Sequence, residues 1–182
     1  MAPKPSLDGA ILDVRGQHQF VLTRKVAPGE FFITGSDGTT SWAVRPDGPV
    51  RFSHDMTRFN RDFPGHEQSL SINNLHDGLD ALKTSYDLEV MPVESNEAID
   101  EADVEPNRLM VAVKKRRFLG AARIEISYAE TSGQIRQVRF VRMPYGPEQV
   151  TLTMTLIEER TLPANHFAHP SHHAPERDVE IE

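Results

Sequence analysis

The chain contains no cysteine, and this absence removes several classes of site at once. Thiol catalysis, disulfide frameworks and cysteine-based zinc sites are all excluded. Aromatic residues are also scarce, at 7% of the 182 residues, with a single tryptophan, Trp42. No apolar run approaches the ~20 residues that a membrane-spanning helix needs. The sequence therefore predicts a domain that is stabilised by an ordinary apolar core rather than by covalent cross-links.

Positive charge is in deficit as well, because the formal net charge is -7. A nucleic-acid-binding surface is therefore not expected, since such surfaces carry an excess of Lys and Arg. The one basic cluster, residues 114–117, lies between two strand-like runs. We interpret it as a solvated turn or strand end rather than as a contact for an anionic surface.

Alternation of apolar and polar residues is what the sequence does contain, most clearly in its last third. Three consecutive runs alternate in this way and are separated by turn residues: 123–129, 134–142 and 149–159. A period of two predicts strands with one buried face and one solvated face.

The first third of the chain predicts a meander of short antiparallel strands, with turn signals such as Asp37-Gly38 between them. The expected strands are 11–14, 19–25, 30–34, 40–45 and 50–53. Two further strands are expected at 87–91 and 108–113. The sequence thus predicts a protein that is rich in antiparallel sheet.

One amphipathic helix is expected at 73–86, within a helical region at about 55–86. Leu75, Leu79, Leu82 and Tyr86 recur at spacings of four, three and four. These spacings place the four side chains on one helix face, which must be buried against another element.

Together these elements predict an α+β fold in which one curved antiparallel sheet forms an incomplete β-barrel. The helical insertion is expected to cover the concave face of that sheet. The expected domain boundaries are a flexible lead at 1–9, one half-barrel domain at 10–167 with the helical lid at about 55–86, and a His-rich, charged tail at 168–182. We expect this tail to be frayed.

Three short motifs resemble those of a known family. They are Phe31-Phe32-Ile33 followed by 36–44 (SDGTTSWAV), the strand pair within 123–140, and the closing segment 162–167 (LPANHF). In these motifs the chain is similar to the LolA/LolB/RseB-like lipoprotein-carrier superfamily, as a divergent or N-terminally shortened member. The resemblance implies a half-barrel with helices as a lid, a hydrophobic cavity that receives acyl chains, and a periplasmic or other extracytoplasmic location. Members also serve as sensor or regulatory domains.

The residues expected to line such a cavity are apolar positions of the strands and the helix. They are Phe20, Leu22, Phe32, Trp42, Val44, Leu75, Leu79, Leu82, Leu109, Val111, Ile124, Ile126, Val138, Phe140, Leu152, Met154 and Leu156. Their number fits a fully packed core equally well. The sequence leaves open whether the apolar interior is an empty cavity or is filled by side chains.

Four histidines fall within eight positions near the end of the chain: His166, His169, His172 and His173. Imidazoles at such spacing are weak candidates for binding Zn²⁺, Ni²⁺ or Cu²⁺. The competing interpretation is a solvated tail whose histidines have no fixed geometry. We expect no resident metal and no cofactor.

The chain carries no Gly-x-Ser-x-Gly nucleophile motif and no phosphate-binding loop. The sequence therefore favours a non-enzymatic, extracytoplasmic domain that binds a lipid, an acyl chain or a lipoprotein in a hydrophobic cavity. Its expected partners are that lipid and a membrane-associated protein. The alternative is a regulatory or sensor module with a packed interior that binds a protein. A third hypothesis is a metal-dependent hydrolase that uses the terminal histidines.

Overall fold

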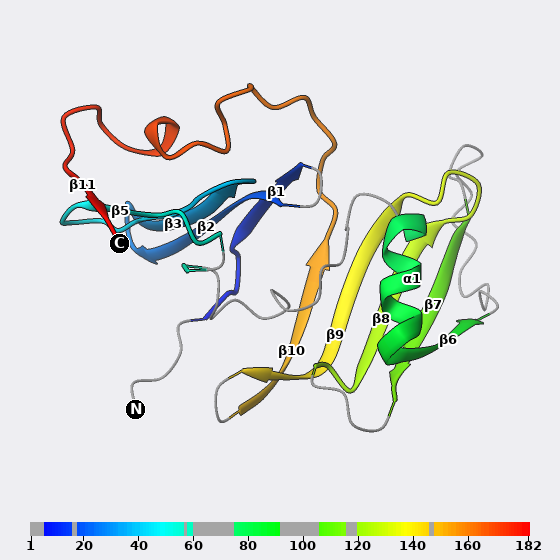
Figure 1. Ribbon diagram of the computed structural model, residues 1–182. Helices are drawn as coiled ribbons and strands as arrows, with labels where there is room; N and C mark the ends of the chain where they lie inside the picture. Colours follow the sequence, from blue (N-terminus) through cyan, green and yellow to red (C-terminus); the bar gives the residue numbers. More distant parts are fainter. Residues whose placement is uncertain are drawn as a thin grey trace. The chain divides into compact units, whose positions relative to one another are not determined.

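The computed structural model describes residues 6–15, 18–56, 58–59, 75–91, 106–115, 120–145 and 148–182. Within these ranges it contains eleven strands, one α-helix and one short 3₁₀ helix, η1 (His169–His172). The chain divides into two compact units (Figure 1). The first holds the N-terminal strands together with Arg160–Glu182, and the second holds the helix and the strands between them. We describe each unit by itself.

The first unit is built on a six-stranded sheet in the order β1-β2-β3-β4-β5-β11. Its strands are β1 (Ile11–Arg15), β2 (Gln19–Ala27), β3 (Glu30–Asp37), β4 (Ser41–Val44), β5 (Val50–Ser53) and β11 (Val179–Ile181). Neighbours from β1 to β5 pair antiparallel, whereas β11 pairs parallel to β5. The order from β1 to β5 follows the chain because short turns join adjacent strands. Only β11 arrives from a distant part of the sequence.

The second unit is a five-stranded antiparallel meander in the order β10-β9-β8-β7-β6. Its strands are β6 (Tyr86–Met91), β7 (Asn107–Lys114), β8 (Arg123–Ala129), β9 (Ile135–Tyr145) and β10 (Glu148–Thr155). The helix α1 (Leu75–Ser85) leads directly into β6. Figure 1 shows α1 lying along this sheet. No helix in the described part of the chain is long and apolar enough to cross a membrane.

The core of the second unit lies on one face of this meander. Cross-strand pairs join Ala112 to Ile124 and Ile124 to Phe140, and all three side chains are buried. Residues paired across neighbouring strands share a face, so these side chains form one apolar row. Leu79 and Leu82 of α1 pack into the same cluster. The helix is thus held by burial of its leucine face rather than by intrinsic propensity.

The core of the first unit is centred on Trp42, which is fully buried. Cross-strand pairs place one row of side chains on its face, which we call the Trp42 face: Asp13, Val21, Gly35, Trp42, Phe52 and Ile181. The indole lies over Gly35, because a Cβ built on Gly35 would come 2.5 Å from Trp42 Cζ2 and 2.7 Å from the Phe20 carbonyl oxygen. Position 35 therefore has no room for a side chain.

The predicted fold class is wrong. The described strands form two sheets instead of one curved sheet, they form no closed barrel, and strand far outweighs helix. The structure is therefore mostly β rather than an α+β fold covered by a helical insertion. The error arises because alternation within a strand predicts a buried face but not which strands share a sheet.

The individual elements are closer to the prediction. Every strand expected from the sequence is present, and antiparallel pairing is confirmed. The helix is present at Leu75–Ser85, but Tyr86 begins β6 instead of ending the helix. The rest of the expected helical lid lies outside the described residues, apart from 55–56 and 58–59, which are not helical. The expectation of a frayed tail is wrong, because residues after 167 form η1 and β11.

We expect Gly35→Ala to destabilise the first unit, because the new methyl group must displace the Trp42 indole or a backbone carbonyl group. Overpacking of this kind costs about 2 kcal/mol or more of the free energy of unfolding. Urea unfolding followed by the fluorescence of Trp42, the only tryptophan, measures the loss. Gly29→Ala is the matched control, since that Cβ would meet nothing within 4 Å and only the positive φ of 79° is strained. Its cost is about 1 kcal/mol. Equal losses in the two variants would contradict the packing argument.

Candidate functional site

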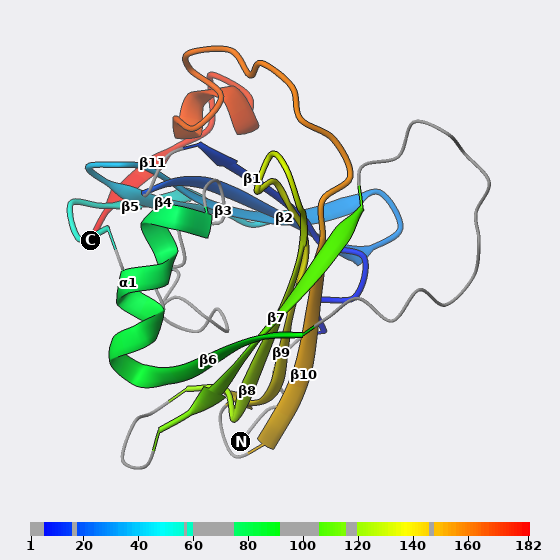
Figure 2. The same cartoon turned by 90° about the vertical axis from the view of Figure 1, so that its right-hand side faces the viewer.

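Residues 160–182, which we call the strap, cross one face of the six-stranded sheet and end in its edge strand β11. Figure 2 shows this segment, in orange and red, above β1 to β5, and Figure 1 agrees. Leu162 and Phe167 join the cluster of Val21, Trp42 and Val44 on the Trp42 face. The strap places histidine, arginine and carboxylate side chains next to the six-stranded sheet. It is therefore the candidate functional site.

The strap is anchored on Trp42. The indole Nε1–H donates a hydrogen bond to the carbonyl oxygen of Phe167 at 2.9 Å, and the Phe167 side chain is fully buried. The His172 ring stacks on the indole with 4.9 Å between ring centroids. Because a buried indole N–H needs an acceptor, this hydrogen bond fixes the strap in register on the sheet.

Two polar residues of β1 hold the start of the strap. The Arg15 guanidinium lies over the Phe167 ring, 4.6 Å from its centroid. The His166 Nε2 lies 3.0 Å from Asp13 Oδ2, and Arg160 forms a longer ion pair with the same carboxylate at 3.6 Å. Asp13 belongs to the row of Trp42, so its carboxylate points at the strap. Charge and aromatic contacts thus reinforce the apolar anchor.

The four histidines form two pairwise contacts, His169 with His173 and His172 with His166, rather than one cluster. His169 Nδ1 lies 3.0 Å from His173 Nε2, so one ring donates and the other accepts. His172 Nε2 donates to the carbonyl oxygen of His166 at 2.5 Å. Burial lowers the pKa of His169 and of His172 below the ordinary value of 6.5. Both imidazoles are therefore held as neutral rings more strongly than in an unfolded chain.

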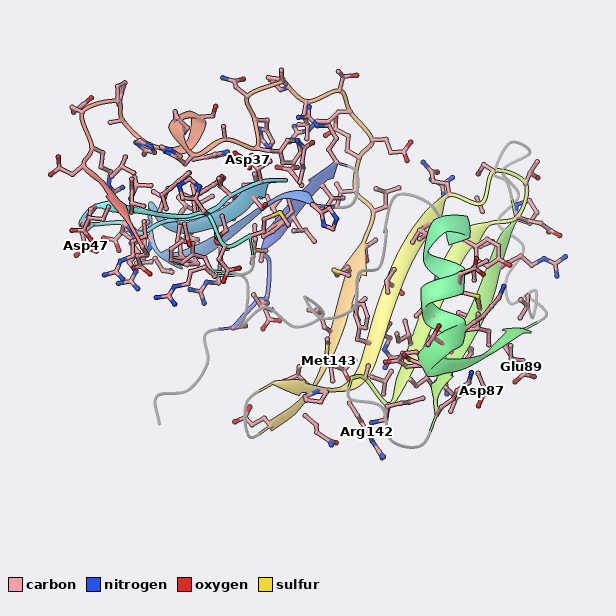
Figure 3. All side chains as sticks on the ribbon, in the orientation of Figure 1. Asp37, Asp47, Asp87, Glu89, Arg142 and Met143 are labelled. Carbon is pink, nitrogen blue, oxygen red and sulfur yellow. The ribbon has the colours of Figure 1, made fainter. Side chains whose placement is uncertain are left out.

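Asp37 closes the hairpin between β3 and β4, at the end of β3 (Figure 3). Its Oδ1 accepts hydrogen bonds from the Thr39 and Thr40 backbone N–H groups, each at 2.8 Å. Both threonine hydroxyls also donate to this carboxylate, each at 2.9 Å. Burial would raise the pKa of Asp37, but these hydrogen bonds outweigh burial and lower it below 3.8. The carboxylate is thus used to build the turn, as the Asp-Gly signal predicts.

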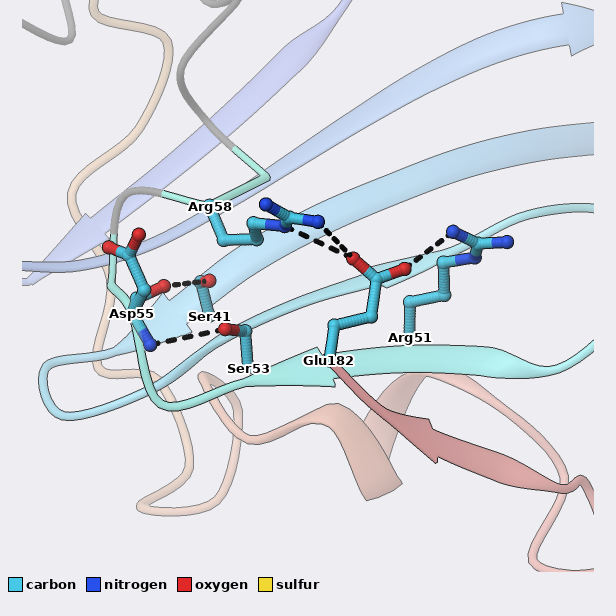
Figure 4. Close-up of polar contacts among 6 residues, drawn as sticks. All are labelled: Ser41, Arg51, Ser53, Asp55, Arg58 and Glu182. Carbon is cyan, nitrogen blue, oxygen red and sulfur yellow. Dashed lines mark hydrogen bonds and ion pairs between the residues drawn. The ribbon is translucent and has the colours of Figure 1, made fainter.

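The end of the strap is bound at the sheet edge. Arg177 donates to the carbonyl oxygens of Gly48 and Arg45, each at 2.7 Å. Beyond it, the Glu182 carboxylate lies between two arginines: Oε1 is 2.5 Å from Arg51, and Oε2 is 3.0 Å from Arg58 Nη2 (Figure 4). Hydrogen bonds from Arg58, and then from Arg51, lower the pKa of Glu182 below 4.5.

The described residues contain no group of three or more His, Asp or Glu side chains with metal-site geometry. His169 and His173 bond to each other, and His172 bonds to a carbonyl oxygen and stacks on Trp42. One ring nitrogen of His169, one of His172 and both of His173 are therefore engaged within the protein. A metal that used these nitrogens would have to break these contacts first.

The Asp13–His166 pair has the form of a general base with an orienting carboxylate. A serine-type hydrolase would also place a hydroxyl nucleophile on the imidazole. The Ser171 hydroxyl donates to the Asn165 carbonyl oxygen at 2.8 Å. The contact between Asp13 and His166 joins β1 to the strap.

The residues predicted to line a cavity are divided between the two units. Phe20, Leu22, Phe32, Trp42 and Val44 belong to the first, and the remaining twelve to the second: Leu75, Leu79, Leu82, Leu109, Val111, Ile124, Ile126, Val138, Phe140, Leu152, Met154 and Leu156.

In the first unit, Trp42 and Val44 share the Trp42 face, whereas the register turns Phe20, Leu22 and Phe32 to the other face. In the second, Leu79 and Leu82 join the packed cluster under α1, along with Ile124, Ile126, Val138, Phe140, Leu152 and Met154. Leu109 and Val111 point to the opposite face, Leu156 is 39% exposed, and the side chain of Leu75 lies outside the described residues.

Several residues of the site were not among the sequence candidates: Asp13, Arg15, Arg51, Arg58 and Glu182. Asp13 and Arg15 alternate along β1, a pattern that could have assigned them to one face. The arginine pair around Glu182 left no local signal, because its members lie more than 120 residues from the glutamate.

No protein-family model matches the chain, and no curated protein matches its sequence. These comparisons therefore do not bear on the resemblance to the lipoprotein-carrier superfamily, which stays a prediction.

We expect the stability of the first unit to fall as the pH drops below 6.5. Burial lowers the folded pKa of His169 and His172, so just below pH 6.5 the unfolded chain binds more protons than the folded chain. The free energy of unfolding then decreases with falling pH. The charge of His173 adds to the lowering of the pKa at both rings, and the charge of His166 adds to it at His172. The hydrogen bond to the His166 carbonyl oxygen and the charge of Asp13 oppose the lowering at His172, and the charge of Asp37 opposes it at His169. Urea midpoints from Trp42 fluorescence at several pH values measure the slope.

The control for this pH dependence is His172→Phe. Phenylalanine keeps a ring against Trp42 but cannot bind a proton, so the slope below pH 6.5 should become shallower. If the variant and the parent chain lose stability in parallel, His172 is not a source of the pH dependence.

Proposed function

We propose that the chain is a non-enzymatic protein-interaction module that binds an extended polypeptide segment at a sheet edge. This is the alternative to the lipid-binding domain that the sequence favours, namely the regulatory or sensor module with a packed interior. Modules of this kind bind a peptide by adding it as a strand to an existing sheet. Backbone hydrogen bonds then supply most of the binding free energy.

The single observation that carries this proposal is β11. A three-residue strand from the end of the chain pairs with β5, which lies about 130 residues earlier. The Val50 N–H donates to the Asp178 carbonyl oxygen and the Glu182 N–H donates to the Phe52 carbonyl oxygen, both at 2.8 Å. The sheet edge is thus competent to accept an extended segment that is remote in sequence.

The packing of the two cores also favours a module over a lipid carrier. In the second unit, Leu82, Ile124 and Phe140 belong to one cluster of buried side chains in mutual contact. In the first, Trp42 is enclosed by Gly35, Phe167 and His172. Groups that already fill an interior leave their apolar surface unavailable to an acyl chain. Lipid binding, a membrane-associated partner and an extracytoplasmic location stay predictions.

A titration with fluorescent fatty acids of increasing length tests the proposal. A carrier must gain about 0.8 kcal/mol of binding free energy for each additional buried methylene. We expect no saturable binding, and no dependence on chain length, for chain purified without detergent. Native mass spectrometry of the same preparation should give the mass of the bare chain. A co-purified lipid, or affinity that rises steadily with acyl length, would overturn the interaction module in favour of the carrier.

A further inference from the structure

The edge of β5 is a binding site that the chain fills with its own end. β11 lies parallel to β5 with Val179 opposite Val50 and Ile181 opposite Phe52. Without β11, β5 would expose a row of unpaired N–H and C=O groups, which is a template for another strand. A segment that pairs with this edge must therefore be extended, and its own backbone N–H and C=O groups must form the hydrogen bonds.

The side chains of β11 contribute little to its own binding. Val179 is 43% exposed and Ile181 is 73% exposed, so neither enters a pocket. The specific contact is instead the carboxylate of Glu182, which Arg51 and Arg58 hold from two sides. The edge thus recognises two properties of its occupant, an extended backbone and a carboxylate at a fixed position along it.

This occupant is attached in a way that permits exchange. The buried anchor of the strap is Phe167, whereas the strand at its end has only three residues, all exposed. Short segments with exposed hydrogen bonds open locally at low free energy, without unfolding the core. Residues 178–182 can therefore leave β5 while Arg177 stays bound to the Gly48 and Arg45 carbonyl oxygens and Phe167 stays bound to Trp42.

The charge of Arg51 and Arg58 determines which segments can bind at the edge of β5. The chain as a whole carries a formal charge of -7, which disfavours acidic partners in general. At this edge, however, the two guanidinium groups face a single carboxylate, as Figure 4 shows. We propose that the edge of β5 binds an extended acidic segment of another polypeptide, which replaces β11 and places a carboxylate between Arg51 and Arg58. This assignment rests on the proposed function and names the partner chemistry of that module.

The experiment uses the whole chain of residues 1–182 and a fluorescent peptide with the sequence of residues 176–182 (ERDVEIE). The tethered segment competes at an effective concentration in the millimolar range, so the parent chain should bind the peptide weakly. Glu180→Pro removes a backbone donor from β11 and leaves β5 intact, so it should free the edge. We expect this variant to bind the peptide at least about tenfold more tightly than the parent chain, as measured by fluorescence anisotropy.

The arginines provide the specificity control. In the Glu180→Pro background, Arg51→Gln should weaken peptide binding about tenfold, because a charge-assisted hydrogen bond is lost. The matched control is Arg45→Gln, which removes the same charge from an exposed arginine and keeps the backbone carbonyl group that accepts from Arg177. The ion pairs of Glu182 are with Arg51 and Arg58. A peptide that ends in Gln instead of Glu should show at least as large a loss, because it gives up the ion pairs with both Arg51 and Arg58. Binding that does not improve in Glu180→Pro, or that ignores Arg51→Gln, overturns the proposal.

A second measurement covers the case in which Glu180→Pro fails to fold. Glu182→Gln changes no backbone atom, and it should speed hydrogen exchange at the Val50 amide, which donates to Asp178. Added ERDVEIE peptide should slow that exchange again. An unchanged Val50 rate in both conditions contradicts the proposal.

Light scattering at rising protein concentration tests whether a second copy of this chain binds the edge of β5 instead. A dimer that Glu182→Gln abolishes would show that a second copy of this chain fills the edge, and would overturn the foreign acidic partner. The outcomes are separable from those of the proposed function. Length-dependent acyl binding overturns the module with a packed interior. Failure of peptide binding without acyl binding removes the β5 edge as the binding site and leaves the packed interior of the module standing.

Discussion

The structure of the first unit depends on the burial of one indole ring. Trp42 has a relative exposure of 0%, and its N–H group is buried with it. On one side the ring requires a residue without a side chain, which is Gly35. On the other it requires a hydrogen-bond acceptor, which the Phe167 carbonyl group provides. A buried donor without a partner costs about 1–3 kcal/mol, so the sheet and the strap stabilise each other.

This constraint explains why the C-terminal residues are ordered although their composition suggests a solvated tail. Proline and histidine favour neither helix nor strand, and the alternation of β11 is too short to detect. What orders the segment is a set of contacts from β1 and β4, above all those of Arg15 and Trp42 with Phe167. None of these contacts is local in sequence, so the sequence could not reveal them.

The sequence predicted what local physics determines. Alternation located the strands, and Asp37-Gly38 located a hairpin whose turn is closed by the Asp37 carboxylate. The leucine spacing located α1. The sheet to which each strand belongs was not predictable in the same way, because alternation is compatible with pairing between any two strands that have one apolar face. In the structure β6 pairs with β7 and β5 with β11, so the two meanders never meet in one sheet. The apolar residues that were predicted to line a single interior therefore belong to two separate cores.

The strap also shows how one segment can combine firm attachment with local opening. Its buried part, at Phe167, is bound through apolar area, an indole hydrogen bond and a guanidinium over a ring, none of which depends on β11. Its exposed part, beyond Arg177, is bound through backbone hydrogen bonds and surface ion pairs, which are individually weak. Since the free energy of opening falls from the first part to the second, the strand at the end can detach while the core stays closed. A sheet edge that is covered in this graded way is protected from indiscriminate strand pairing but remains open to a segment that matches its arginines.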